Sequence, residues 1–487
     1  MFALKFMYRM LEMGNWGDLF SSIVGFLYLG MIIATIVVVI LDNRNPVKTL
    51  SWVLVLSFLP MVGLVLYFFF GRDRRKEKLI GKKGFARLTR RPMAEYQQQQ
   101  AFAEEENQHA MMQYFRKVND SLPFEGNEVT LYTTGESMVE ALLEAIEGAR
   151  HHIHMLFYIF EADEVGTKVR DALIKKAKEG VEVRFLYDDV GSWELPNDFV
   201  EEMLCAGIES RAFLKVRFPR FTGKVNYRNH RKIVVVDGHI GFIGGMNIAS
   251  RYLNGVKWGI WKDLHMKVVG KGVYGMQTSF LTDWYATDRS LITSSAYFPE
   301  ITPSGDVTLQ VATSDPIGEW RDIMQGLLLM ITSSKKYLYI QTPYLLPTEP
   351  VLLALKTVAL AGVDVRIMIP SRADSAITHW GSLSYLSELM VAGVRIYLYE
   401  KGFLHSKMLV SDDAISTVGS TNIDFRSFEH NFEVNAFMYG HHPALALKEL
   451  FLRDQKDAYQ LSLKTWNKRP WYQKVLESVI RLFAPLL

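Results

Sequence analysis

The sequence contains very little cysteine and carries very little net charge. Its 487 residues include one cysteine, Cys205, which excludes an intramolecular disulfide and a cysteine-rich zinc site and favours a reducing compartment. The formal net charge of +3 is too small for a dedicated nucleic-acid-binding protein, which would carry a basic stripe. Hydrophobic residues, in contrast, make up 49% of the chain, enough for the cores of two or three domains.

Two runs near the N-terminus contain no charged residue. Residues 19–41 and 49–71 are each long enough, at about 1.5 Å per helical residue, to cross a hydrocarbon core of about 30 Å. The first run is too long for a signal peptide and is followed by Asp42 to Pro46 in place of a small-residue cleavage site. A buried core helix remains the alternative for the second run. We therefore predict a transmembrane helical hairpin.

Basic residues are concentrated after the second run. Ten lysines and arginines lie between Arg72 and Arg91, against Arg44 and Lys48 in the connecting loop. Basic residues resist translocation, so both termini and the rest of the chain are predicted to be cytoplasmic. Beside a membrane helix, each basic residue also attracts anionic lipid headgroups by about 1 kcal/mol. An anionic membrane surface is therefore an expected partner.

The remainder of the chain contains an internal duplication. Residues 180–184 return as 362–366, and residues 239–248 return as 414–423. In each copy strands alternate with helical patterns, which predicts an α/β class: two tandem α/β sandwich domains with mixed sheets. The predicted organisation is a cytoplasmic N-terminus (1–18), the hairpin (19–71), a basic and Gln/Glu-rich connector (72–124), a first α/β domain (125–290), a second (306–460) and a C-terminal amphipathic segment (461–487).

The same motif, His-x-Lys-x4-Asp, occurs once in each copy. Strand alternation puts His230 beside Lys232 and His405 beside Lys407 on one face. An imidazole beside an ammonium suits phosphate chemistry, because the first supplies a nucleophile or proton carrier and the second holds anionic oxygen. One such pair is more often structural, but two in corresponding positions indicate function.

Further polar residues follow both motifs at matching places. Asn247 and Asn422 each end a Gly-x-x-Asn turn and can donate to phosphate, while Asp263 and Glu433 could each accept a hydrogen bond from an imidazole nitrogen. The candidate catalytic residues are His230, Lys232, Asp237, His405, Lys407 and Asp412, with Asn247, Asn422, Asp263 and Glu433 as phosphate-binding and supporting residues. A histidine cluster at residues 151–154 has no matching carboxylates, so no metal site is predicted there.

On these paired motifs, residues 127–440 resemble the phospholipase D superfamily. Residues 43–49, 157–160, 229–232, 341–344 and 403–407, together with the paired N-terminal helices, are similar to those of bacterial cardiolipin synthases. One departure is visible: residues 249–252 read Ala-Ser-Arg-Tyr where family members often carry Gly-Asp-Glu-Tyr, which puts the local lipid selectivity in doubt.

The resemblance implies a fold and an activity. Both motifs would line one cleft, with Asp237 and Asp412 as structural support. The enzyme would be a phosphatidyltransferase of the bacterial inner membrane that moves a phosphatidyl group from one phosphatidylglycerol to another through a phosphatidyl-histidine and releases glycerol. By analogy His230 attacks and His405 handles the proton, although the two near-identical motifs do not distinguish them.

The same resemblance implies that no cofactor, metal or nucleic acid is needed. The alternatives are a hydrolytic phospholipase D, a phosphatidylserine synthase, a membrane-tethered nuclease and a non-catalytic lipid-binding scaffold. The near-neutral charge argues against the nuclease, and the retention of both motifs argues against the scaffold.

Overall fold

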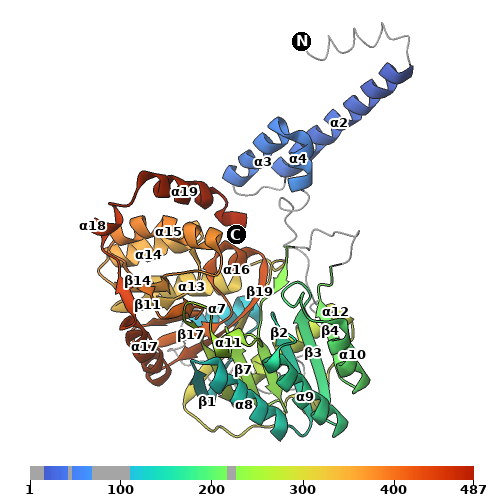
Figure 1. Ribbon diagram of the computed structural model, residues 1–487, viewed down its shortest axis with the longest axis vertical. Coiled ribbons are helices and arrows are strands. Elements are labelled where there is room, and N and C mark those ends of the chain that lie inside the picture. The colour runs from blue at the N-terminus through green and yellow to red at the C-terminus, as the bar shows by residue number, and fades with distance from the viewer. Residues whose placement is uncertain (1–15, 42–45, 68–109, 217–225, 487) are drawn as a thin grey trace. The chain divides into compact units, whose positions relative to one another are not determined.

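A computed structural model describes residues 16–41, 46–67, 110–216 and 226–486 (Figure 1). The chain divides into an N-terminal helical unit and a larger α/β unit, and each is described by itself. The basic run between residues 72 and 91, on which the predicted orientation depends, lies outside the described residues.

The N-terminal unit contains three helices, α2 (Trp16–Leu41), α3 (Pro46–Phe58) and α4 (Pro60–Leu66). Within α2, the stretch Ile23–Leu41 is long and apolar enough to cross a membrane; among the described residues no other helix is. The predicted second span is divided at Leu59, because a proline disfavours helical backbone in the residue before it and lacks an N–H of its own. The structure therefore does not confirm a hairpin of two spanning helices.

The α/β unit contains two copies of one mixed sheet. The strand order is β1-β9-β7-β6-β2-β3-β4 in the first half and β10-β19-β17-β16-β11-β13-β14 in the second, where β20 adds an edge. In both halves the last three strands of that order run parallel to one another and the others pair antiparallel. The predicted tandem α/β arrangement with mixed sheets is confirmed.

The first-half strands are β1 (Pro123–Tyr132), β2 (His152–Phe157), β3 (Glu182–Asp188), β4 (Glu209–Phe213), β6 (Ile233–Val236), β7 (Ile240–Gly244) and β9 (His265–Val269). Their second-half counterparts are β10 (Val307–Ser314), β11 (Tyr337–Gln341), β13 (Asp364–Pro370), β14 (Arg395–Tyr399), β16 (Met408–Ser411), β17 (Ile415–Gly419) and β19 (Asn431–Tyr439), followed by β20 (Ala458–Gln460).

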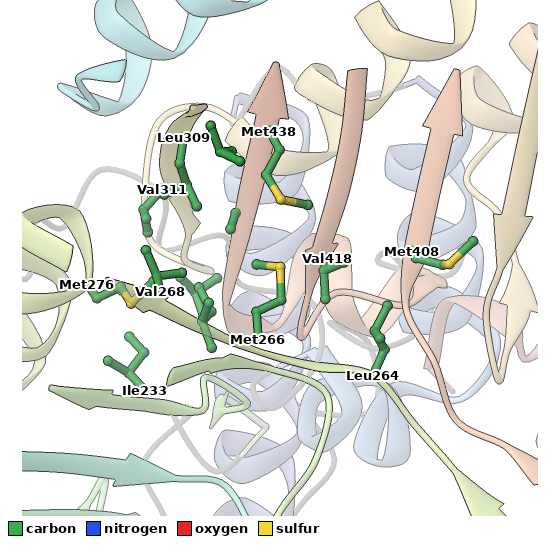
Figure 2. Packing of buried hydrophobic residues seen from close by; sticks show 14 of the residues in the cluster. Ile233, Leu264, Met266, Val268, Met276, Leu309, Val311, Met408, Val418 and Met438 are labelled. Carbon is green, nitrogen blue, oxygen red and sulfur yellow. The ribbon is translucent and has the colours of Figure 1, made fainter. Parts of the chain in front are cut away.

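The two halves form one continuous structure. Strands β1 and β10 pair antiparallel, with Phe124 opposite Leu309, so the two sheets are joined edge to edge. Strand β7 also contacts β17 and β19 across a shared core. Figure 2 shows Met266 of the first half and Val418 and Met438 of the second within this core, all fully or almost fully buried. Burial of this apolar layer fixes the halves, and with them the two motifs, relative to each other.

Helices pack on both faces of the sheets. The first half carries α8 (Gly135–Gly148), α9 (Glu164–Lys178), α10 (Asn197–Cys205) and α12 (Val273–Asp288), and the second carries α13 (Asp322–Ser333), α14 (Glu349–Leu360), α15 (Ala376–Val391) and α17 (His441–Gln455). Beyond them lie α18 (Leu463–Trp466), α19 (Trp471–Leu482) and a short 3₁₀ helix, η3 (Ala484–Leu486). Helices α12 and α17 contribute to the core that the two halves share.

One helix of the predicted connector belongs to the core of the second half. Helix α7 (Ala110–Asn119) buries Phe115, whose ring centroid lies 4.6 Å from that of Phe437. The side chain of Asn119 donates to the carbonyl of Thr313 at 2.9 Å. In chain order, α7 therefore packs on the second half before the chain enters β1 of the first half.

Candidate active site

The histidine of the first motif follows a two-residue strand that pairs with the opposite half. Strand β5 (Arg228–Asn229) pairs in parallel with the start of β19, and the His230 N–H donates to the carbonyl of Phe432 at 2.9 Å. The next residue of β19 is Glu433, whose carboxylate oxygens lie 3.0 and 3.1 Å from His230 Nδ1. The first-half imidazole thus receives its carboxylate from the second half.

The second motif repeats this arrangement in reverse. Strand β15 (Gly402–Leu404) pairs in parallel with β8 (Ile260–Lys262) of the first half, and the His405 N–H donates to the carbonyl of Lys262 at 2.6 Å. The next residue is Asp263, and its Oδ2 lies 2.6 Å from His405 Nδ1. The carboxylates predicted beside the imidazoles are therefore exchanged between the halves, a pairing that the matching sequence positions left open.

The two motif lysines are buried beside the histidines. Lys232 Nζ donates to the carbonyl of His230 at 2.6 Å, and Lys407 Nζ lies 2.8 Å from His405 Nδ1. Burial, assisted by the repulsion of Lys407, lowers the pKa of Lys232 to about 7, and burial lowers the pKa of Lys407 to about 8. Glu433 and Asp263 act against both shifts. An anion bound beside these ammonium groups would therefore raise their pKa values again.

Both histidines are buried and neutral at physiological pH. Burial lowers the pKa of His230 to about 4 and that of His405 to about 3, while Glu433 and Asp263 oppose these shifts. At His405 the Lys407 ammonium and the Asp263 carboxylate both lie against Nδ1, so these contacts do not fix the tautomer of that ring. At His230 the Nδ1 faces the Glu433 carboxylate and carries the proton of the neutral ring. The lone pair is then on Nε2, the nitrogen available for attack or for accepting a proton.

Aromatic rings line both histidines. The ring of Tyr158 lies edge-on to His230 with centroids 4.8 Å apart, and that of Trp261 lies 5.3 Å from His405. Lys232 Nζ is 5.3 Å from the centroid of Tyr158. Sequence reasoning missed these contacts. Trp261 lies two residues before Asp263, but Tyr158 lies 72 residues before His230, so no local pattern connects it to the site.

The two predicted phosphate donors already take part in local structure. Asn247 accepts from the Ile159 N–H at 3.1 Å and donates to the Tyr252 hydroxyl at 2.8 Å. The Oδ1 of Asn422 is buried and has no hydrogen-bond partner among the described residues, although the backbone N–H of Asn422 donates to Ser427. The Nδ2 of Asn247 has a second N–H, which can donate to a phosphate oxygen while the first bonds to Tyr252.

The motif aspartates lie away from the histidines. Asp237 begins the turn after β6, about 16 Å along the strand from Lys232, and accepts three backbone N–H groups from residues 150–152. Asp412 accepts three from residues 335–337. Both adopt positive φ angles, 50° and 55°, which aspartate tolerates better than most residues. The structure therefore does not bring these two residues to the site.

The supports of the two carboxylates differ. Glu433 accepts from the Ser420 hydroxyl and from Asn431 Nδ2 at 3.1 Å. Its carbonyl accepts from Arg231 Nε at 3.0 Å, and the same guanidinium forms a buried ion pair with Asp283 at 2.6 Å. Arg231, the middle residue of the first motif, was not singled out from the sequence; a charged residue between two functional ones is a weak signal.

At Asp263, the contacts that hold Glu433 are missing or replaced by others. Asp263 Oδ1 accepts from the Leu264 N–H at 2.8 Å. The position of Ser420 is taken by Gly245, where a Cβ would collide with the Asp263 carboxylate. The position of Arg231 is taken by Ser406. The shorter acid is therefore held close against a glycine.

The histidine cluster at residues 151–154 lies in the core. His152 Nε2 contacts the Gln277 side chain at 3.1 Å and His154 Nδ1 contacts it at 2.7 Å, and both rings are fully buried. Burial lowers the pKa of His152 to about 3 and that of His154 to about 4. In the part of the chain that the structure describes, no three His, Cys, Asp or Glu side chains are grouped as metal ligands.

Known families match most of this chain. The model of a family described as "Cardiolipin synthase, PLD-like domain" matches residues 142–257 and 327–455, which carry most of both halves. A second, described as "Phospholipase_D-nuclease N-terminal", matches residues 30–72.

Individual relatives agree with these matches. The chain is 42% identical to a cardiolipin synthase of Geobacillus sp. (strain WCH70), over 92% of this chain and 91% of that protein. It is 37% identical to the major cardiolipin synthase ClsA of Bacillus subtilis (strain 168), over 96% of this chain and 99% of that one. The crystal structure of phosphatidylserine synthase from Haemophilus influenzae Rd KW20 superposes with a TM-score of 0.59 at 14% identity, covering 78% of this chain and 98% of that one, which is a likeness of fold.

Proposed function

Because this chain belongs to the cardiolipin synthases of the phospholipase D superfamily, which are phosphatidyltransferases, we propose that it transfers a phosphatidyl group between two phosphatidylglycerol molecules, forming a phosphatidyl-histidine and releasing glycerol. The observation that carries the proposal is the pair of buried, neutral histidines, each with a carboxylate of the opposite half at Nδ1 and a buried lysine beside it.

The first displacement uses both histidines. Nε2 of His230 attacks the phosphorus, forming an N–P bond as the P–O bond to glycerol breaks, and His405 gives a proton to the departing oxygen. The proton reaches His405 when the phosphodiester binds, because an anion raises the pKa of a buried imidazole. Glu433 stabilises the imidazolium character that develops on His230.

The second displacement reverses the first with a new acceptor. The primary hydroxyl of a second phosphatidylglycerol gives its proton to His405 and takes the phosphatidyl group, breaking the N–P bond and forming cardiolipin. Lys232 and Lys407 stabilise the negative oxygens in both steps, joined by Asn247 and Asn422. No nucleotide-activated lipid is needed, because one phosphodiester is exchanged for another of the same kind.

The enzyme works at the inner membrane of a bacterial cell, with membrane helices in residues 19–71 and a cytoplasmic catalytic unit. An N-terminal helix of suitable length and composition supports membrane association, and the basic residues after Gly71 support the orientation. A reporter enzyme fused after Leu487 tests the topology: activity specific to the cytoplasm is expected, and labelling from the periplasm would contradict it.

Product analysis tests the reaction. Purified full-length enzyme is mixed with phosphatidylglycerol vesicles, and lipids and glycerol are followed by mass spectrometry. We expect one glycerol per cardiolipin and, because the bonds exchanged are alike, conversion of cardiolipin back to phosphatidylglycerol when glycerol is added. Phosphatidic acid as the main product would favour a hydrolytic phospholipase D, and a requirement for a cytidine-activated lipid would favour a phosphatidylserine synthase. A double His230→Ala, His405→Ala variant is the control.

A further inference from the structure

Helix α19 turns its polar side toward the protein. Glu477 is buried and pairs with both terminal nitrogens of Arg469. Arg481 bonds to Glu388 of α15 at 2.6 Å, and its guanidinium lies 4.1 Å from the ring centroid of Tyr385. Figure 1 shows α19 outside α15, at the outer edge of the second half. Ion pairs and a cation–π contact, rather than apolar packing, make up much of the attachment of this helix.

The outward side of α19 is apolar. The exposed fractions are 76% for Trp471, 51% for Val475, 47% for Val479 and 78% for Leu482. Exposed large apolar residues at neighbouring positions are Tyr472, Leu476 and Phe483. A surface helix of a soluble domain normally buries its apolar stripe and exposes its charges. A contiguous apolar face of this kind marks a surface that binds another apolar phase or molecule.

The charged residues of the C-terminal segment, 461–487, are all positive except Glu477. Lys464, Lys468 and Lys474 are exposed, whereas the one acidic residue after residue 460, Glu477, is buried and paired with Arg469. Aromatic and aliphatic side chains on one face, with exposed lysines beside them, are the composition of a helix that lies in the plane of an anionic bilayer. A second protein chain would not require this excess of basic over acidic residues.

We propose that α19 docks on an anionic phospholipid surface, with Trp471, Val475, Val479 and Leu482 in the headgroup and acyl boundary. This attachment is separate from the N-terminal helices and does not depend on which reaction the site catalyses. Its position has a consequence for the site: η3 contacts α16 (Phe425–Glu429), the helix that begins three residues after Asn422, and Ala484 is buried there. A docked α19 therefore holds the second-half motif near the lipid surface.

Single-cysteine labelling tests the docking. The full-length chain is reconstituted in vesicles of phosphatidylglycerol and phosphatidylethanolamine, with an environment-sensitive fluorophore on Val475→Cys, Val479→Cys or Leu482→Cys in a Cys205→Ser background. The natural Cys205, exposed at the end of α10 on the other half, is the matched control when labelled in the unaltered chain. Thermal unfolding checks that each variant folds.

Opposite results are expected for the labels on α19 and for the label on Cys205. Labels on α19 should show blue-shifted emission and at least a twofold quenching by spin-labelled lipid, whereas the label on Cys205 should stay in water. Water-like emission at all three α19 positions would overturn the proposal. Cross-linking between two copies through Val479→Cys without lipid quenching would overturn it in favour of a second copy. Equal quenching in zwitterionic phosphatidylcholine vesicles would overturn the preference for anionic lipid. None of these readouts depends on catalysis.

Discussion

The two halves of the α/β unit share a strand order but support their histidines differently. In the first, Glu433 reaches His230 and is held by Ser420, Asn431 and the clamp of Arg231 with Asp283. In the second, the shorter Asp263 reaches His405 against a bare Gly245. Duplication thus preserved the imidazole, the ammonium and a carboxylate, which the chemistry requires, while the groups behind them diverged. The difference suits a division of roles, in which one histidine is held firmly and the other exchanges protons.

The largest effect is expected from the histidines themselves. His230→Ala and His405→Ala should each reduce turnover by at least about 10³-fold, because both displacements need both imidazoles. Cardiolipin formation measured by mass spectrometry checks this, with circular dichroism to confirm folding. A second measurement separates the two roles: each variant is mixed with labelled phosphatidylglycerol, the reaction is stopped with acid, and label bound to the protein is counted. His405→Ala should still become labelled slowly, and His230→Ala should not become labelled. The reverse pattern would exchange the two roles.

The exchanged carboxylates come next. Glu433→Gln and Asp263→Asn should each lower kcat by about 10²-fold, since each orients the histidine of the other half. Glu433 raises the pKa of His230 against burial, so its loss lowers that pKa further, and the acid limb of the pH–rate profile should move to lower pH. Ser420→Ala, which removes a donor and keeps the carboxylate, is the milder control. An unchanged acid limb in Glu433→Gln would show that the limb belongs to another group.

The Arg231–Asp283 ion pair behind Glu433 tests whether the different supports of the two halves affect the stability of the protein. Arg231→Met should destabilise the protein by about 3–5 kcal/mol, because Asp283 is left buried without its partner. The corresponding Ser406→Ala should change stability by less than about 1 kcal/mol. Thermal unfolding compares them, and the double variant Arg231→Met, Asp283→Leu should recover most of the loss. Equal losses of stability in Arg231→Met and Ser406→Ala would mean that the Arg231–Asp283 ion pair does not make the first half more dependent on this position than the second.

The smallest effects are expected from the two motif aspartates, and they should be nearly equal in the two halves. Asp237→Asn and Asp412→Asn should each lower the free energy of unfolding by about 1–2 kcal/mol. The amide has one acceptor oxygen where the carboxylate uses two, so one backbone N–H loses its acceptor, whereas asparagine tolerates the positive φ. The kcat per folded molecule should not change. A large fall in kcat for either variant, with stability intact, would return that aspartate to the site.

The sequence predicted the tandem fold because its signals are local and repeated. Alternation and spacing identified the histidine and lysine of each motif, and matching positions identified Asp263 and Glu433. The exchange of the carboxylates was not predictable, because it depends on β5 and β15 pairing with strands more than 140 residues away. The break in the second apolar run at Leu59 was not predicted, because proline is tolerated in membrane helices. Arg231 was missed because its partner, Asp283, lies 52 residues later on α12.

The antiparallel pairing of β1 with β10 has a kinetic consequence. A sheet that runs unbroken from one half into the other has no hinge, so the gap between the two imidazoles is set when the chain folds rather than when lipid binds. In the proposed reaction the donor, the departing glycerol and the acceptor therefore all meet the same fixed pair of imidazoles. A high concentration of glycerol should then compete with the acceptor lipid for the proposed phosphatidyl-histidine.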